Sequence, residues 1–552
     1  MPLNNHASNF SFNIGNIALD GFISTHGVVN LLNIPYATIP ARFTPAALLD
    51  PSLIHGRRDA SHYGPQCPQP AGPLHGLMSH MFEDMSLSHH SGELDCLHLN
   101  VYAPPSALSP QNSTKIPVLV WIHGGSFNTG ANTTEFDGNH LVKRSMNLGK
   151  PIIVITINYR LNILGFLSSH ELIEEAKDAG QVPILNQGIN DQAIALQWIQ
   201  ENISHFGGDA SQVTAAGESA GAASIFYLLK HGVPLFSRAI ICSSPHLMFH
   251  KISDAQATFD HLVQAAGIDA SAPYQTKLQA LRSYKAEDLI ALIPPFSLTF
   301  PVSFPIEDPN WFVDWDLEKI SSGEYWAELP PWCPEIIIGH LKDEAALFLN
   351  PTYPSDLTEE EAVDHVQHTI PDAHAAAIAL STLQPNIETS PFRLLLVLGT
   401  HSLFIAPDFE FSTRIASHPQ HKIYLYSIDI ADNIPGPLGG YSWHSFGNAI
   451  FFYQPACQAH PELAATADRM SDAYTSFMYG DTRPIWEEFK TKGRMLSWNG
   501  NRTGLVDVGF DWKDLVLEKL AAEGRQDWID AYRRDGWKLA LPVPGVCRPR
   551  KT

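Results

Sequence analysis

A serine between two glycines is the residue best placed to do chemistry in this chain. Gly217, Glu218, Ser219, Ala220 and Gly221 form GESAG, the single GxSxG of the sequence. Where such a pentapeptide joins a strand to a helix, the glycines let the backbones close around a strained turn that exposes the serine hydroxyl. The amide of Ala220 would then begin a helix, where unpaired donors and the helix dipole favour negative charge. The pattern predicts a nucleophilic serine, although such pentapeptides also arise by chance.

A second glycine-rich sequence could supply more amides for a developing oxyanion. HGGSF, residues 123–127, directly follows the apolar run 118–122, which predicts a strand. A loop in this position can donate backbone N–H groups to a carbonyl oxygen as it gains charge. We therefore expect the amides of Gly125, Ser126 and Ala220 to form an oxyanion hole. An ordinary glycine-rich turn is the alternative interpretation.

Alternating strands and helices are expected to position these residues. Continuous β-branched runs at 118–122 and 152–157 predict strands that are buried on both faces. Residues 191–205 and 220–230 carry helical patterns on either side of the strand that ends in GESAG. Short antiparallel strands are expected in residues 15–48, where apolar segments alternate with glycine and proline turns. This order predicts an α/β fold with a large, mostly parallel central sheet, helices on both faces and a small N-terminal antiparallel β segment.

The composition excludes several classes of protein. With 552 residues, of which 44% are hydrophobic, the chain can bury a large core, which excludes a disordered protein. The net charge of -22 excludes nucleic acid as a partner, because phosphate binding requires a basic surface. No break in composition divides the chain, so we expect a single domain over residues 1–552.

The cysteines and apolar segments bear on metals and membranes. The six cysteines show no CxxC or Cys/His spacing, so we expect no metal site. The N-terminus lacks a basic segment followed by an apolar run, and there is no uncharged stretch of about 18 or more apolar residues. We therefore expect no signal peptide, no stable membrane anchor and a cytoplasmic location, or secretion if the sequence is a processed form.

Several longer stretches resemble the type-B carboxylesterase family, which contains carboxylesterases, fungal lipases and cholinesterases. They are NIPYATIPARF, LDCLHLNVYAP, WIHGGSFNTG, DQAIALQWIQENISHFGGDASQVTAAGESAG and SSGEYWAELPPWCPEIIIGHLKDEAALF. The resemblance runs from about residue 17 to beyond residue 450 and departs mildly at Ala215 and Ala216, where relatives commonly have larger apolar residues. It implies an α/β-hydrolase fold, ester cleavage by a serine, and no cofactor.

The resemblance also identifies an acid and a base downstream of Ser219, in the chain order of α/β-hydrolases. The acid is Glu344 in KDEAALF, with the neighbouring Asp343 as its rival. The base is His444, which lies in a glycine-rich loop before an apolar element. Seven other histidines follow Glu344: His365, His368, His374, His401, His418, His421 and His460. Relatives often carry an acidic residue three positions after the histidine, where this chain has Gly447.

Two further features follow from the resemblance. Cys67 and Cys96 match the family's first disulfide, which closes a loop beside the active site. A disulfide is unusual in a reduced cytosol, so either this bridge stays open or the expected cytoplasmic location is wrong. Within this loop, 67–96, five apolar side chains could form a lid or could pack against the body of the protein. They are Leu74, Leu77, Met78, Met81 and Phe82. Residues 250–330 form a possible helical insertion whose Pro/Phe-rich part could line a pocket.

The predicted function is hydrolysis of small to medium apolar carboxylic esters or lactones through an acyl-enzyme. The substrate is a small-molecule ester. An acyltransferase that uses the same three residues is the first alternative, because a bound alcohol can replace water at the acyl-enzyme. A non-catalytic scaffold, similar to neuroligins, is the second, but such proteins lose the nucleophile that Ser219 retains. The sequence determines neither the physiological ester nor the oligomeric state.

Overall fold

A computed structural model describes most of the chain. The described residues are 6–50, 56–70, 75–82, 90–109, 111, 113–293, 304–350, 353, 356–369, 390–481, 486–490, 493–507 and 536–541. Leu74, most of the Pro/Phe-rich part of 250–330 and parts of the loop 67–96 therefore lie outside them.

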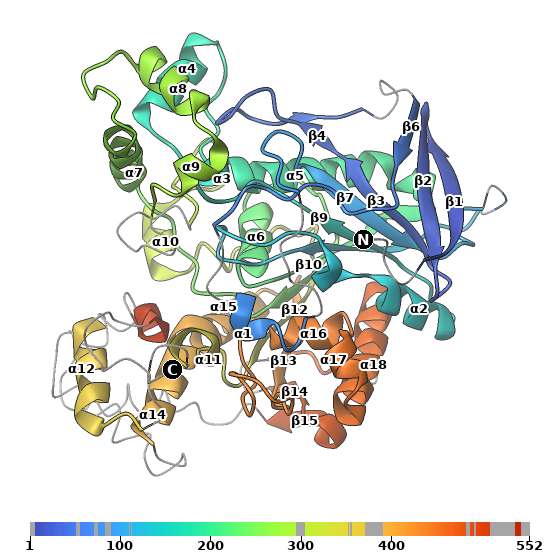
Figure 1. Cartoon of the computed structure of the whole chain (residues 1–552). Coiled ribbons are helices and arrows are strands. Elements are labelled where there is room, and N and C mark those ends of the chain that lie inside the picture. The colour runs from blue at the N-terminus through green and yellow to red at the C-terminus, as the bar shows by residue number, and fades with distance from the viewer. Residues whose placement is uncertain are drawn as a thin grey trace.

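One large twisted sheet organises the described residues (Figure 1). Its strand order is β1-β2-β3-β7-β9-β8-β10-β11-β12-β13-β14-β15, and β6 pairs with β2. Along this order, each pair of neighbouring strands from β9 to β14 is parallel, whereas each pair from β1 to β9, and the pair β14 and β15, is antiparallel. The predicted α/β-hydrolase architecture, with a parallel centre and an antiparallel N-terminal part, is confirmed.

The strand bounds place the glycine-rich loops at the carboxyl edge of the sheet. The strands are β1 (His6–Ile14), β2 (Ile17–Ser24), β3 (Val29–Pro35), β6 (Gly56–Asp59), β7 (His98–Ala103), β8 (Ile116–Ile122), β9 (Ile153–Ile157), β10 (Gly208–Glu218), β11 (Arg238–Cys242), β12 (Glu335–Leu341), β13 (Lys422–Ile428), β14 (Arg494–Trp498) and β15 (Gly504–Asp507), with β4 (Ala37–Thr38) and β5 (Ala47–Leu48) in a separate pair. Because β8, β10, β11, β12 and β13 are consecutive in the sheet, the segments that follow them meet at one edge.

Helices cover both faces of this sheet. They include α1 (His75–Met78), α2 (Asn139–Asn147), α3 (Asn162–Phe166), α4 (His170–Asp178), α5 (Gln187–Asn202), α6 (Ala220–Leu229), α7 (Ile252–Ala265), α8 (Tyr274–Ser283), α9 (Ala286–Ile290), α10 (Leu317–Ser322), α11 (Ala346–Leu349), α12 (Glu359–Thr369), α14 (Pro391–Thr400), α15 (Ala406–Ala416), α16 (Phe446–Phe451), α17 (Pro455–Gln458) and α18 (Pro461–Met478). A π-helical turn, η5 (His401–Ile405), joins α14 to α15.

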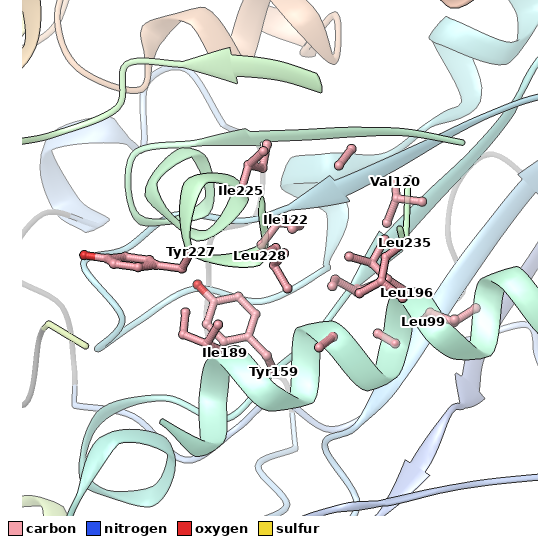
Figure 2. Packing of buried hydrophobic residues seen from close by; sticks show 14 of the residues in the cluster. Leu99, Val120, Ile122, Tyr159, Ile189, Leu196, Ile225, Tyr227, Leu228 and Leu235 are labelled. Carbon is pink, nitrogen blue, oxygen red and sulfur yellow. The ribbon is translucent and has the colours of Figure 1, made fainter. Parts of the chain in front are cut away.

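Alternate side chains of the central strand β8 enter two different cores. Val120 and Ile122 pack with residues of α5 and α6 on one face (Figure 2). Trp121 packs on the other face, with residues of α2, α16 and α18. Every residue of β8 is buried, as expected for a strand covered by helices on both sides. The sheet is therefore held rigidly where its loops form the site.

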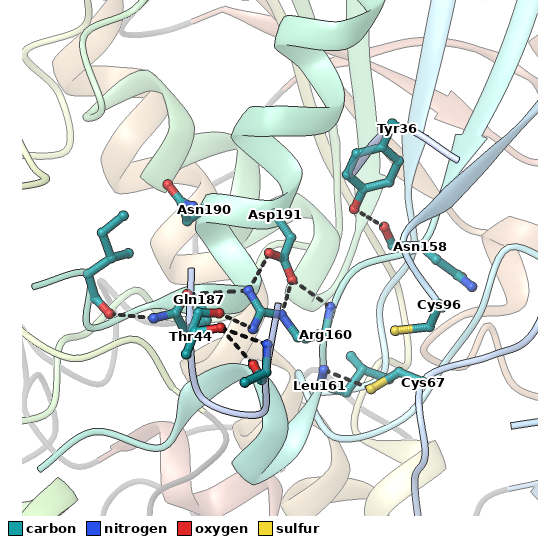
Figure 3. Close-up of polar contacts among 12 residues, drawn as sticks. Tyr36, Thr44, Cys67, Cys96, Asn158, Arg160, Leu161, Gln187, Asn190 and Asp191 are labelled. Atoms are coloured by element: carbon teal, nitrogen blue, oxygen red, sulfur yellow. Dashed lines mark hydrogen bonds and ion pairs between the residues drawn. The ribbon is translucent and has the colours of Figure 1, made fainter. Parts of the chain in front are cut away.

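The helix predicted to begin at Asp191 begins earlier, at Gln187. Asp191 was expected to lie at the helix start, but it lies inside the helix because its carboxylate has a buried partner. Arg160 Nη2 lies 2.7 Å from Asp191 Oδ1, and both side chains are almost fully buried (Figure 3). A buried charge without such a partner would be strongly destabilising, which fixes this residue in the interior rather than at a cap.

The helical run that contains α14, η5 and α15 is strongly apolar. Pro391–Ala416 is long and apolar enough to cross a membrane by length and composition, but 78% of its apolar window is buried inside the protein. It packs as a core helix in the part of the molecule that faces the histidine loop.

Candidate active site

Ser219 lies at the sharp turn between β10 and α6. Its backbone has φ 56° and ψ -122°, a conformation that L residues rarely adopt. The flanking glycines make this turn possible, since a Cβ on Gly217 would lie 2.6 Å from the backbone of Gly221. The side chain of Ser219 is thereby lifted above the carboxyl end of the strand, in the strand-turn-helix context that a nucleophile requires.

His444 and Glu344 form a direct pair beside this turn. His444 Nδ1 lies 2.7 Å from Glu344 Oε2, and both side chains are buried. The second carboxylate oxygen, Oε1, accepts a 2.7 Å hydrogen bond from the amide of Leu341, which fixes the carboxylate. A carboxylate on Nδ1 orients the imidazole and leaves Nε2 to act toward the elbow. Glu344 and His444, predicted as acid and base, are thus brought together.

Asp343, the rival acid, has a different role. Its Oδ1 lies 2.8 Å from Nη2 of Arg393, and its Oδ2 accepts a 3.1 Å hydrogen bond from the amide of Ser442. The amide of Asp343 also donates to the carbonyl oxygen of Ser442. Asp343 therefore ties the acid turn to the histidine loop, while the carboxylate of Glu344 faces the imidazole.

The HGGSF loop lies directly against the nucleophile. A Cβ on Gly124 would lie only 3.0 Å from Cβ of Ser219, so a side chain at this position would separate the loop from the elbow. Gly125 and Ser126 adopt φ angles of 100° and 54°. Among the described residues their amides have no hydrogen-bond acceptor, and the amide of Ala220 lies at the first position of α6. The loop that carries Gly125 and Ser126 therefore lies against Ser219, and Ala220 follows Ser219 directly at the start of α6.

Glu218 is a further charged group at the site that the sequence reasoning did not single out. Its Oε1 lies 3.2 Å from His444 Nε2 and accepts a 2.9 Å hydrogen bond from Ser445 Oγ. Its Oε2 accepts a 3.2 Å hydrogen bond from Asn448 Nδ2. The sequence feature that could have identified Glu218 is its place as a charged residue inside the GESAG motif. These two donors follow His444 closely in sequence, on either side of Gly447, where relatives often have an acid.

Charge and burial act in opposite directions on His444. Burial lowers its pKa, but the negative charges of Glu218 and Glu344 and the hydrogen bond to Glu344 raise it, and the net pKa is raised. Glu218 itself has a raised pKa, mainly because of burial. Nearby Glu135 is affected by the same charge, since burial and then Glu218 raise its pKa to about 8. Two buried carboxylates, Glu218 and Glu344, therefore favour the imidazolium form of His444.

The raised pKa of His444 gives a pH-dependence prediction. A general base must be neutral to accept a proton, so kcat/KM should fall as the pH drops through a pKa above the ordinary histidine value of about 6.5. Glu218→Gln removes one of the anions that raise this pKa, so the acidic limb should move to lower pH. Both effects are measured in pH profiles of kcat/KM for one ester.

An exposed glutamate on α5 supplies the control for this profile. Glu201→Gln should leave the acidic limb in place, because Glu201 lies on the surface away from His444. If Glu218→Gln left the limb unchanged or moved it to higher pH, the proposed electrostatic effect of Glu218 would be wrong.

The predicted disulfide is not formed in this structure. Cys67 and Cys96 are both buried free thiols (Figure 3). Cys67 Sγ accepts a hydrogen bond from the amide of Leu161, and Cys96 Sγ donates to the carbonyl oxygen of Glu93. The contact with Cys67 and burial hold the pKa of Cys96 well above its usual range, which keeps this thiol protonated. The bridge is thus corrected to a pair of neighbouring thiols.

Within the described residues, no three histidine, cysteine or carboxylate side chains gather as a metal site would require.

Comparison with known proteins decides the family. The model described as "Carboxylesterase family" matches residues 18–502. The chain belongs to the carboxylesterase family. Among relatives of this chain, secreted lipase 1 of Botryotinia fuckeliana (strain B05.10) is 32% identical over 462 residues, which cover 75% of this chain and 74% of the lipase.

Other similarities cover less of the sequence. Lipase 2 of Geotrichum candidum is 33% identical over 335 residues, 56% of each chain, and para-nitrobenzyl esterase of Bacillus subtilis (strain 168) is 34% identical over 351 residues, 61% of this chain and 63% of that esterase. The matched part of the chain thus spans less than two thirds of the length of these two relatives. The solved structure of a thermophilic PNB esterase matches 94% of this chain and 99% of its own, with a TM-score of 0.68 and 25% identity.

Proposed function

We propose that this carboxylesterase-family protein is a serine hydrolase that cleaves carboxylic esters through an acyl-enzyme. The observation that carries the proposal is the buried Glu344–His444 pair at 2.7 Å, next to the elbow that presents Ser219. A solvated histidine or carboxylate needs no such partner, whereas a general base needs both its tautomer and its orientation fixed. The scaffold alternative does not account for this arrangement.

The proposed reaction uses two acyl-transfer steps. In the first, His444 takes the proton of the Ser219 hydroxyl as its oxygen attacks the ester carbonyl carbon. The carbonyl oxygen becomes an oxyanion that accepts hydrogen bonds from the amides of Gly125, Ser126 and Ala220. Protonated His444 then donates its proton to the leaving alkoxide, and the alcohol departs. In the second step, His444 takes a proton from water, the hydroxide attacks the acyl-enzyme, and collapse of the intermediate returns the proton to Ser219.

The buried surroundings strengthen each charge in this sequence. Glu344 and Glu218 stabilise the imidazolium that forms when His444 takes a proton. The amides are fixed before the reaction, so they cost no reorganisation when the oxyanion forms, and one such donor typically contributes about 100-fold to 1000-fold in rate. Ser219, His444 and Glu344, together with the three amides, therefore suffice for the proposed ester hydrolysis.

Apolar esters of small to medium size are the proposed substrates. The rings of Phe404 and Phe348 pack beside His444, with centroid distances of 4.6 and 5.4 Å. An aromatic wall next to the base favours an apolar acyl or alcohol group there. Relatives that include lipases and a para-nitrobenzyl esterase support this substrate class.

An acyl-chain series of p-nitrophenyl esters tests the proposal. We expect turnover that is highest for short to medium chains, and loss of turnover after treatment with an organophosphonate. Mass spectrometry should place one phosphonyl group on the peptide that contains Ser219. If no ester of the series is turned over and no label is found, the protein is not an esterase. An added alcohol acceptor in the same assay separates hydrolysis from acyl transfer.

A further inference from the structure

A buried carboxylate joins the histidine loop to a segment from the beginning of the chain. Asp432 is fully buried, and its Oδ2 accepts a 2.9 Å hydrogen bond from Nε1 of Trp443. The same oxygen lies 2.8 Å from Nε2 of His80. Its Oδ1 accepts a 2.9 Å hydrogen bond from the amide of Ile434. This carboxylate therefore contacts both the histidine loop, through Trp443, and the early segment that carries His80. Neither contact takes part in the proposed reaction.

Both ring nitrogens of His80 face hydrogen-bond acceptors. Nδ1 lies 3.0 Å from the carbonyl oxygen of Leu77, and Nε2 faces the carboxylate of Asp432. A carbonyl oxygen only accepts, so Nδ1 donates to Leu77, and the ring links this carbonyl oxygen to the buried carboxylate of Asp432.

Trp443 directly precedes His444, so its position sets that of the base. Its side chain is fully buried between the ring of His80, at a centroid distance of 6.0 Å, and the ring of Phe446, at 5.7 Å. The indole N–H is a donor only, and Asp432 is its acceptor. Any shift of Asp432 therefore moves the indole, and with it the backbone that carries the imidazole.

The loop that contains Asp432 is closed tightly around His80. The amide of Asp432 donates to the carbonyl oxygen of Tyr441, and its own carbonyl oxygen accepts from the amide of Gly440. At Gly436 a Cβ would lie 2.7 Å from the ring of His80, so the loop approaches the imidazole as closely as a glycine allows. This contact is built into the loop rather than made by a freely moving surface side chain.

The segment that carries His80 is anchored by apolar packing as well. Met81 and Phe82 are buried in the same core cluster as Trp443, and Leu77 and Met78 pack against that cluster. Four of the five apolar side chains of the loop 67–96 thus pack against the body of the protein in this structure.

We propose that Asp432 is a positioning residue for the base His444. Through His80, Asp432 also fixes the segment 77–82. The position of this segment and the alignment of His444 therefore depend on the same carboxylate. The inference rests on the proposed function, because His444 must act as a base for its alignment to affect turnover.

Three substitutions remove single parts of this network. Asp432→Asn removes the charge, Trp443→Phe removes the indole N–H while an aromatic ring remains, and His80→Gln removes the imidazole ring. A displacement of about 1 Å at a reacting group can cost about 100-fold in rate, so we expect kcat to fall about 10-fold to 100-fold in Asp432→Asn, with KM within about threefold. Trp443→Phe should act in the same direction. His80→Gln should have a smaller effect, because the bond from Trp443 survives.

The measurement is kcat and KM for a short p-nitrophenyl ester, expressed per active site titrated with an organophosphonate. Titration removes unfolded protein from the comparison, so a loss of kcat per titrated site reports alignment rather than stability. His62→Gln is the matched control, because His62 pairs with Asp59 on the surface, where both side chains are more than half exposed. This variant should retain the kcat of the unsubstituted protein.

The outcomes separate the inference from the proposed function. If the unsubstituted protein is neither titrated nor active, the proposed function fails before any variant is compared. If it is active but Asp432→Asn and Trp443→Phe keep kcat per titrated site within twofold, Asp432 stabilises the fold without positioning the base, and the inference is overturned. A normal kcat in His80→Gln beside a slow Asp432→Asn would overturn the coupling to the segment 77–82.

Discussion

Ser219→Ala should abolish ester turnover while leaving the protein folded. Loss of the nucleophile removes the covalent step, and in a comparable serine enzyme such a loss costs about 10⁶-fold in kcat. Alanine fits the site, because the turn is held by its flanking glycines and by the amide of Ser219, which donates to the carbonyl oxygen of Cys242. The measurement is the hydrolysis rate of the best p-nitrophenyl ester, together with the thermal unfolding midpoint.

Ser224 supplies a matched control in the same helix. Its hydroxyl donates to the carbonyl oxygen of Ala220 within α6, a bond that helical residues lose at small cost. Ser224→Ala should therefore retain turnover and organophosphonate labelling. Full activity in Ser219→Ala would show that another residue is the nucleophile, and the elbow would then have to be read as a purely structural turn.

Glu344→Gln should reduce kcat by about 10⁴-fold, as the equivalent change does in the Ser-His-Asp template. The amide would keep the size of the side chain but could present N–H to Nδ1 of His444, which would then hold the wrong tautomer. Its negative charge, which helps to raise the pKa of His444, would also be lost. Steady-state kinetics at several pH values measure both effects.

Asp343, the carboxylate next to Glu344, supplies the comparison for Glu344→Gln. Asp343→Asn breaks a partly exposed ion pair with Arg393, an interaction that contributes about 1 kcal/mol or less, and leaves an oxygen that can accept from Ser442. Its turnover should therefore stay within about tenfold of the unsubstituted protein. If Asp343→Asn were the more damaging of the two substitutions, the acid would have to be reassigned.

Local sequence determined much of the candidate site. The glycines around Ser219 require a tight strand-to-helix turn, and the apolar run before HGGSF requires a buried strand that ends at the glycines. Both are consequences of short-range backbone chemistry, so composition and spacing suffice to predict them. Alternating β-branched strands and helices predicted the parallel sheet for the same reason.

Choices between neighbouring residues needed tertiary structure. Glu344 and Asp343 are adjacent and chemically alike, and the direction in which each carboxylate points depends on Arg393 and on the histidine loop, about 50 and 100 residues away. The start of α5 was misplaced because the buried partner of Asp191 is 31 residues distant in sequence. Side-chain direction is set by packing, which no local pattern contains.

The charged surroundings of the base were also decided by the tertiary fold. Glu218 is part of the motif that identified Ser219. Its carboxylate is held beside His444 by hydrogen bonds from Ser445 and Asn448, which are 227 and 230 residues distant in sequence. His80 and Asp432 meet across 352 residues. The sequence by itself predicted the serine at the strand-to-helix turn and the glycine-rich loop that lies against it. Only the tertiary structure decided which carboxylates hold His444, because burial and distance set both their orientation and their electrostatic effect.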